Sequence, residues 1–319
     1  MSVRHVAALA AVLGALAGLV AGSLVGPGRE PVTLAEQVTP PTTARPARPD
    51  PAFAAGAASS PRLAPLLAGT DGRVDLGALL RAPLSELRTS VLTALRHRSE
   101  GGWLYARALA RQCSVLEMIE MRDRLVPAAF QPAIDLNQPV AQRALTLRDQ
   151  LMAGCSQLQP DELLEAMNVP PGAADPLIAV MDQPARPGSA EARERLAAIL
   201  ARPDPLMLAE LGPNLLARDG EALVFDGRRI DGEERQLLEG AALLLPCSLG
   251  LACDGQDEAV WGPCLVDGLC GTTTREDAVM ATVNAGEHPE RRAAVLAWVE
   301  RLRTAVVARD VDRFLKPPA

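Results

Sequence analysis

The sequence predicts a mainly α-helical protein, a bundle or irregular superhelix of short helices with one small β-hairpin, cross-linked by disulfides. Three observations support this prediction. From Leu63 onward, apolar residues recur at the spacing of a helix face. The chain has six cysteines, an even number that suits pairing. Residues 6–26 carry no charge, so the helical part follows an N-terminal hydrophobic segment.

Residues 1–26 are predicted to be a targeting segment. At about 1.5 Å per residue, the uncharged stretch of residues 6–26 is long enough to span a membrane. This length favours an uncleaved signal anchor, a transmembrane helix in the inner membrane; a cleaved signal peptide, with a shorter apolar region, is the alternative. Arg4 favours a cytoplasmic N-terminus. The rest of the chain is therefore expected on the periplasmic side of the inner membrane, or free in the periplasm if the leader is cleaved.

Residues 27–62 are predicted to be a disordered linker. They contain eight prolines in 36 positions and have no core-forming hydrophobic pattern. The helical domain is expected over residues 63–319, with a four-cysteine subregion at residues 240–275.

Within this domain, helix starts and helix faces can be read from the residue types. Ser189 is an expected N-cap, as are Asp175 and Asp204, each followed by proline and leucine. The two Asp-Pro-Leu segments could mark a helical repeat, but we favour two independent helix starts because the residues between them align poorly. The predicted helix faces are Leu84, Leu87, Val91 and Leu95; Tyr105, Leu109, Cys113 and Leu116; Val140, Ala144, Leu147 and Leu151; Leu196, Ile199 and Leu200; Leu237, Ala241 and Leu244; and Val295, Trp298, Leu302 and Val306.

One segment indicates β-structure. Residues 222–225 and 228–230 flank Asp226-Gly227, a dipeptide typical of a tight hairpin turn. Further along the chain, after the last cysteine, Thr273 and Thr274 precede acidic residues by three positions, which predicts a helix N-terminus with a capping box.

The six cysteines are the candidate disulfide residues. In a domain outside the cytoplasm, an even number of cysteines favours disulfides over free thiols. Zinc is a competing reading for the last four, but zinc sites favour closer spacing within each pair. A bond between the first two is expected to join two packed helices, with two buried thiols as the alternative. The six candidates are Cys113, Cys155, Cys247, Cys253, Cys264 and Cys270.

The pairing of the last four cysteines has three possibilities. Residues six apart on a helix point in directions about 240° apart, so each close pair is expected to straddle a helix end, with breaks at Gly250 and Gly255 and at Gly262-Pro263. A short hairpin between Cys247 and Cys270 would give a nested pairing, Cys247 with Cys270 and Cys253 with Cys264. We favour this nested pairing.

The segments Cys247-Ser-Leu-Gly-Leu-Ala-Cys253 and Cys264-Leu-Val-Asp-Gly-Leu-Cys270 follow a leucine-rich helix and precede a long C-terminal one. This layout resembles a loose group of uncharacterised proteobacterial envelope proteins that share a Cys-x-Leu-Gly-x-x-Cys…Cys-x-x-x-Gly-x-Cys region. The resemblance covers roughly residues 100–319 and is strongest over residues 240–310. It implies an envelope location and disulfides, and no activity.

Scarce residue types exclude several chemistries. The one lysine, Lys316, follows a leucine, which rules out a Gly-Lys phosphate-binding loop and a lysine nucleophile pair. Outside the leader there are two histidines, too few for a three-histidine metal centre. Of these, His97 follows a helix and His288 precedes one, and both are expected to be surface or capping residues. No catalytic residue, cofactor or metal site is therefore predicted.

The acidic residues are compatible with one enzymatic hypothesis. Asp226, Asp231, Glu233 and Asp254 could supply two facing carboxylates for hydrolysis of a wall polymer, although turns and acidic first helical turns explain them without catalysis. A calcium site at Asp254, Asp257 and Glu258 is less favoured than a solvated loop, because the alternating oxygen ligands of such sites are missing.

Two functional hypotheses follow. Residues 63–319 hold 27 basic and 36 acidic residues, a net charge of −9, which disfavours binding to nucleic acid. The favoured hypothesis is a non-enzymatic binding or assembly module that faces the periplasm, contacts the membrane through residues 6–26 and binds an unknown envelope protein. The alternative is a periplasmic carboxylate-dependent hydrolase acting on a cell-wall polymer.

Overall fold

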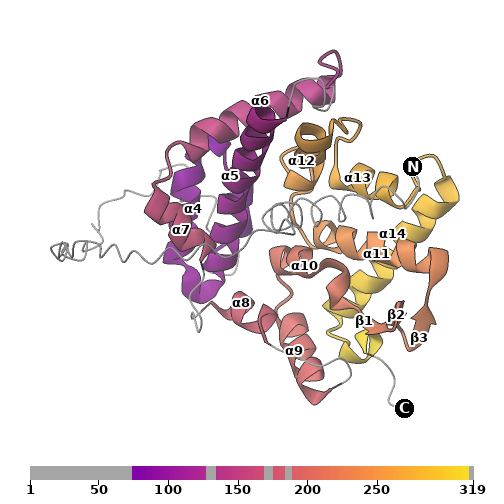
Figure 1. Ribbon diagram of the computed structural model, residues 1–319. Helices are drawn as coiled ribbons and strands as arrows, with labels where there is room; N and C mark the ends of the chain where they lie inside the picture. The colour runs from indigo at the N-terminus through magenta and orange to yellow at the C-terminus, as the bar shows by residue number, and fades with distance from the viewer. Residues whose placement is uncertain (1–73, 127–133, 169–174, 184–188, 316–319) are drawn as a thin grey trace, which may run out of the picture. The chain divides into compact units, whose positions relative to one another are not determined.

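Helices form most of the fold, as the computed structural model shows for residues 74–126, 134–168, 175–183 and 189–315 (Figure 1). The predicted mainly α-helical class is confirmed. The hydrophobic segment of residues 6–26 and the linker of residues 27–62 lie outside the described residues. Within the described part, none of the helices is both long enough and apolar enough to cross a membrane.

The helices and strands follow in chain order. They are α3 (Gly77–Leu80), η1 (Leu84–Glu86), α4 (Leu87–Arg96), η2 (Arg98–Glu100), α5 (Gly102–Leu125), α6 (Pro139–Cys155), α7 (Pro160–Met167), α8 (Pro176–Met181), α9 (Ala190–Ala201), α10 (Pro205–Leu211), η4 (Gly212–Leu215), β1 (Ala217–Asp219), β2 (Ala222–Phe225), β3 (Arg228–Ile230), α11 (Gly232–Ser248), α12 (Glu258–Asp267), α13 (Arg275–Thr282), α14 (Pro289–Val307) and η5 (Val311–Phe314).

The long helix α5 is the centre of the first group of helices, and it packs against α4, α6 and α7. Its predicted face from Tyr105 to Leu116 is buried. The predicted bond between Cys113 of α5 and Cys155 of α6 is present. Close packing also depends on glycine: a Cβ at Gly154 would lie 2.2 Å from the carbonyl oxygen of Leu84, so only glycine lets α6 approach that turn.

The helix α11 is the centre of the second group, packed along α14 and against α10 and α13. A Cβ at Gly240 of α11 would lie 2.9 Å from the side chain of Val283, at the end of α13, so the glycine allows these helices to approach closely. On α14, the predicted apolar face from Val295 to Val306 is buried. These two helices carry much of the core in this half.

The predicted hairpin is present, and a third strand extends it. Both turn residues, Asp226 and Gly227, have positive φ, as a two-residue hairpin turn requires. Leu223 pairs with Ile230 across the hairpin, and on the other side of β2 the short strand β1 pairs antiparallel. The strand β1 is not predicted from the sequence, because its three residues show no alternating pattern.

Four predicted N-caps are confirmed. The side chains of Asp175, Ser189, Asp204 and Thr274 each accept a hydrogen bond from a backbone N–H in the first turn of α8, α9, α10 and α13, respectively. These short polar side chains bind amide groups that a helix N-terminus leaves without partners. The local sequence therefore fixed these helix starts.

Asp175 and Asp204 also bind α5 with their second carboxylate oxygen. Oδ2 of the fully buried Asp175 accepts the N–H groups of Trp103, at 2.8 Å, and Leu104. Oδ2 of Asp204 accepts the hydroxyl of Tyr105 at 2.9 Å. The Asp-Pro starts of α8 and α10 thus both attach to the beginning of α5.

The nested cysteine pairing is wrong, because the structure pairs Cys247 with Cys253 and Cys264 with Cys270. Each pair does straddle a helix end. The predicted break at Gly250 is confirmed, since this residue is left-handed. The predicted break at Gly262-Pro263 is wrong, because these residues lie inside α12 and the chain turns at left-handed Gly268 instead. Because α12 separates the two turns, each cysteine bonds to the other cysteine of its own turn.

Candidate functional site

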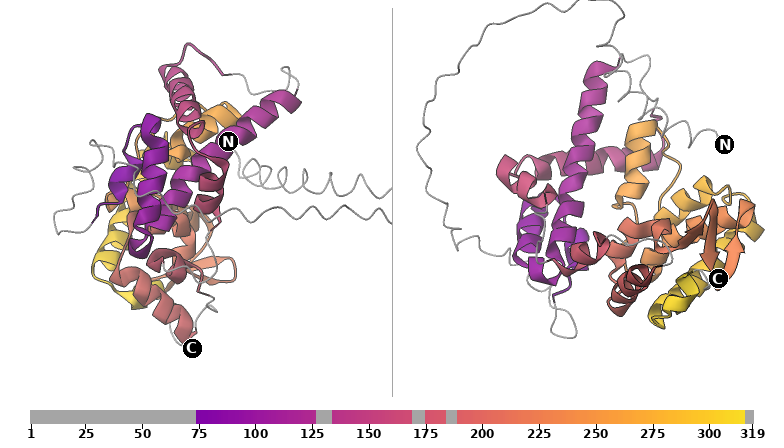
Figure 2. Two further views of the ribbon diagram at one scale, coloured as in Figure 1. Left: turned by 90° about the vertical axis from the view of Figure 1, so that its left-hand side faces the viewer. Right: turned by 60° about the horizontal axis from the view of Figure 1, so that its bottom comes forward.

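A cleft of about 460 Å³ opens between α5 and α12, close to α10. Figures 1 and 2 show α12 beside α5, and the two helices are in contact. A volume of this size is within the usual range for ligand pockets. Its lining consists of Leu80, Ala108, Arg111, Gln112, Val115, Met118, Leu206, Leu251, Ala252, Asp254, Gln256, Asp257, Glu258, Ala259, Gly262, Pro263, Val266, Asp267 and Arg275.

One wall of the cleft is a face of α5. Ala108, Arg111, Val115 and Met118 lie at helical spacing along it. The opposite wall is α12 with the segment before it, in which the Cys247–Cys253 bond closes a six-residue turn that carries Leu251 and Ala252. The wall opposite α5 is therefore covalently constrained just before α12 begins.

Two arginines hold the polar part of the cleft in place. Asp257 caps α12 through the N–H of Ala259 and also binds the guanidinium of Arg275, with a distance of 2.9 Å between Asp257 Oδ1 and Arg275 Nη2. Arg111 binds Glu210 of α10 at 2.7 Å and Glu258 of α12 at 3.4 Å. These bonds connect α5, α10, α12 and α13 around the cleft.

The pKa of Arg111 reflects this position. Its partial burial lowers the pKa, but the nearby carboxylates of Glu210 and Glu258 more than offset burial, so the net shift is upward. Arg111 therefore stays charged and serves as a fixed bridge between the walls.

The cleft is acidic. Four acids and two arginines line it, a net charge of −2. Asp257 and Glu258 bind those arginines, whereas Asp254 and Asp267 make no ion pair with any residue that the structure describes. The cleft can therefore attract a positively charged group to these two carboxylates, which no described cation neutralises.

An exposed apolar strip continues from the cleft along α5. Met118, Met121 and Leu125 have side chains that are 54%, 55% and 74% exposed, and their i, i+3, i+7 spacing puts them on one face. Across the cleft, α12 adds Val266 and, just beyond its end, Leu269 follows, both exposed. We call these five residues the apolar strip. Exposed apolar residues grouped in this way usually mark a binding surface.

The apolar strip lies on a fixed junction. Arg122 of α5 donates hydrogen bonds to the carbonyl oxygens of Leu265, at 3.0 Å, and Val266 at the end of α12. These carbonyls are among the last of a helix and have no partner within it. The arginine holds the end of α12 against α5. The strip residues on α5 and those at the end of α12 therefore form one surface.

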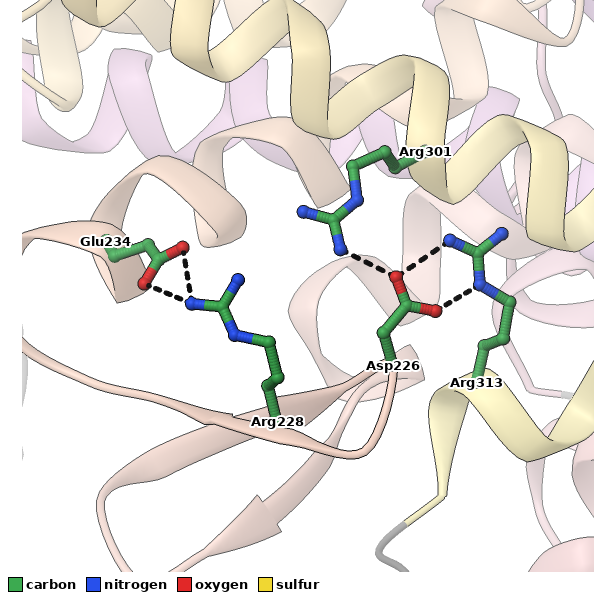
Figure 3. A network of polar contacts seen from close by, with 5 residues as sticks. All are labelled: Asp226, Arg228, Glu234, Arg301 and Arg313. Atoms are coloured by element: carbon green, nitrogen blue, oxygen red, sulfur yellow. Dashed lines mark hydrogen bonds and ion pairs between the residues drawn. The ribbon is translucent and has the colours of Figure 1, made fainter.

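Each of the four acids of the hydrolase hypothesis has a bonding partner of its own. Asp226 accepts hydrogen bonds from Arg301, at 2.6 Å, and from Arg313, at 2.8 Å to its Nη2 (Figure 3). Hydrogen bonds from Arg313 are the largest cause of a pKa of about 2 for Asp226, with burial opposing and Arg301 adding to the shift. A carboxylate held charged in this way does not supply a proton to a leaving group.

The other three acids also have local roles. Asp231 is exposed beside Arg229, and Glu233 binds Arg291 of α14. Asp254 accepts the N–H of Gln256, two residues on, and is the one member of the four that lines the cleft. In the described structure these three acids therefore have partners of their own: Arg229 for Asp231, Arg291 for Glu233 and the Gln256 N–H for Asp254.

The remaining predicted positions also have structural explanations. His97 ends α4 beside Glu100, and His288 precedes α14 beside Glu290. In the part of the chain that the structure describes, no three of the metal-binding residue types His, Cys, Asp and Glu are grouped to hold an ion.

The cleft could not be predicted from the sequence. The spacing of Met118, Met121 and Leu125 is the same as that of a buried helix face, so the pattern alone cannot reveal their exposure. The cleft also joins residues far apart in sequence, such as Arg111 and Glu258, and no local signal relates them.

Comparisons with known proteins give no further assignment: no family model, no curated protein and no solved structure matches this chain.

Proposed function

We propose that this chain is a non-enzymatic binding module of the bacterial envelope, facing the periplasm, that takes up a segment of a partner protein in the cleft between α5 and α12. The cleft, with its apolar strip, carries the proposal. It offers exposed apolar surface together with two carboxylates that make no ion pair with any described residue, and its other charged side chains bind one another and fix the walls. These features are more typical of a surface that binds another molecule than of an active site for acid–base catalysis.

The envelope location is part of this proposal. All six cysteines are in disulfides, which form and persist in oxidising compartments such as the periplasm. The uncharged residues 6–26 would anchor the chain in the inner membrane, or direct it to the periplasm and be cleaved. The resemblance to proteobacterial envelope proteins agrees with this location.

Site-specific photo-crosslinking in cells tests the function. A benzophenone amino acid replaces Met118 in the full chain, and a control chain carries it at Leu164 of α7, an apolar residue of similar exposure that does not line the cleft. After irradiation of cells, the Met118 position should give a discrete higher-mass adduct that the Leu164 position lacks. No adduct at either position, or the same adducts at both, would contradict the proposal.

A further inference from the structure

We infer that the occupant of the cleft is a basic amphipathic segment of another protein, whose apolar side lies on the apolar strip and whose arginine or lysine side chains reach Asp254 and Asp267. This inference rests on the proposed function and names the chemistry of its partner.

The apolar side of the occupant follows from the strip. Met118, Met121 and Leu125 form an exposed row along α5. Met118 and Val266 of α12 both line the cleft, and the exposed Leu269 follows the end of α12. A surface between two helices matches the row of apolar residues that an amphipathic helix presents at i, i+3, i+4 and i+7. Two of the five strip residues are methionines, whose flexible side chains adapt to the shape of a bound partner.

The basic side of the occupant follows from charge. Asp254 and Asp267 are exposed and lie on the α12 side of the cleft. Because the cleft arginines are already bound to Asp257, Glu258 and Glu210, they do not neutralise these two carboxylates. A cationic side chain is therefore the complementary group for this rim.

The same charges argue against two other occupants. In a two-fold dimer, one patch meets its own copy, so Asp254 and Asp267 of the two cleft rims would approach each other. An anionic lipid surface would likewise meet a cleft of net negative charge. A partner with positive charge avoids both repulsions.

Fluorescence anisotropy tests the inference with the full chain in phosphatidylcholine nanodiscs. The probe is a labelled peptide of about twelve residues with leucines at i, i+3, i+4 and i+7 and arginines between them. We expect saturable binding that weakens as salt concentration rises, and no binding to empty nanodiscs. Peptides with glutamate in place of arginine, or serine in place of leucine, should bind at least about tenfold more weakly, a difference of one decade in Kd.

Two pairs of variants locate the binding. The double variant Asp254→Asn/Asp267→Asn should raise the Kd about tenfold, through two lost charge interactions at the rim. Its control, Glu194→Gln/Glu287→Gln, makes the same change in net charge at exposed positions away from the cleft and should leave the Kd within about twofold. Met118→Ser should weaken binding and Leu164→Ser should not.

Specific outcomes would overturn the inference. These are equal binding of the arginine and glutamate peptides, equal loss in the test and control variants, or a dimer in sedimentation that Met118→Ser dissociates. If the Met118 photo-adduct forms in cells but the arginine peptide does not bind, the chemistry assigned to the partner is wrong and the binding function stands. If neither occurs, the binding function itself is wrong.

Discussion

At the scale of single residues, a few carboxylates each join several segments. Asp175 receives four backbone N–H groups, two from the first turn of α8 and two from the start of α5. Asp226 joins the hairpin to α14 and η5 through two arginines. The guanidinium of Arg301 also lies over the ring of Trp298, 3.9 Å from its centroid, a favourable cation–π position.

Replacement of Asp175 should destabilise the protein strongly. In Asp175→Asn, an amide NH₂ takes the place of one acceptor oxygen, so either α8 or α5 loses its buried acceptor. We expect a loss of about 2–4 kcal/mol in the free energy of unfolding, from an N-cap and from buried N–H groups without partners. Urea denaturation of the full chain measures it. Asp182→Asn, an exposed position at the other end of α8, should cost less than about 0.5 kcal/mol.

Asp226 should make stability depend on pH in acid. Its pKa is lowered from 3.8 to about 2 by Arg313 and Arg301, so its contribution is fully present above pH 4 and is lost as the pH falls towards 2. At neutral pH the shift corresponds to about 2 kcal/mol.

The variant Asp226→Asn tests this linkage. It should therefore be less stable than the natural chain by about 2 kcal/mol at pH 7, and this difference should shrink between pH 4 and pH 2. Urea denaturation at several pH values provides the comparison. As a control, Asp231→Asn, an exposed position at the start of α11, should change the free energy of unfolding at pH 7 by less than about 0.5 kcal/mol. A difference for Asp226→Asn that stays constant down to pH 2 would contradict the assignment.

At the scale of elements, α12 is held at both ends. Asp257 caps its start and binds Arg275, while Arg122 and the Cys264–Cys270 bond hold its end. The helix forms one wall of the cleft. Its attachment at both ends gives the cleft a defined shape, which would lower the entropy cost of binding the partner proposed above.

The three disulfides should differ in their effect on stability. The Cys113–Cys155 bond closes a loop of sequence separation 42, and the other two close loops of separation 6. The chain-entropy relation gives about 4 kcal/mol for the first and about 2 kcal/mol for each of the others. Cys113→Ala/Cys155→Ala should therefore lower the urea midpoint more than Cys247→Ala/Cys253→Ala. The reverse order would show that native-state packing, and not loop length, determines the contribution of these bonds.

At the scale of the whole molecule, local signals predicted local structure. Periodic apolar residues predicted α5, α11 and α14, short polar residues predicted four N-caps, and Asp226-Gly227 predicted the hairpin turn. The predicted nested cysteine pairing is wrong because the pairing depends on the position of α12. The cleft was not predicted because it depends on how α5 packs against α12. Those arrangements are set by contacts between distant segments, such as Arg122 with Leu265, which a single sequence does not show.

The Cys113–Cys155 bond has a further consequence for a chain cut by a protease. It joins α5 to α6 across the connection that contains residues 127–133. A single cut within residues 127–133 would leave two pieces that run as one band on a non-reducing gel and as two after reduction. Both cleft walls lie outside that connection, so a single cut there removes none of the residues that line the cleft.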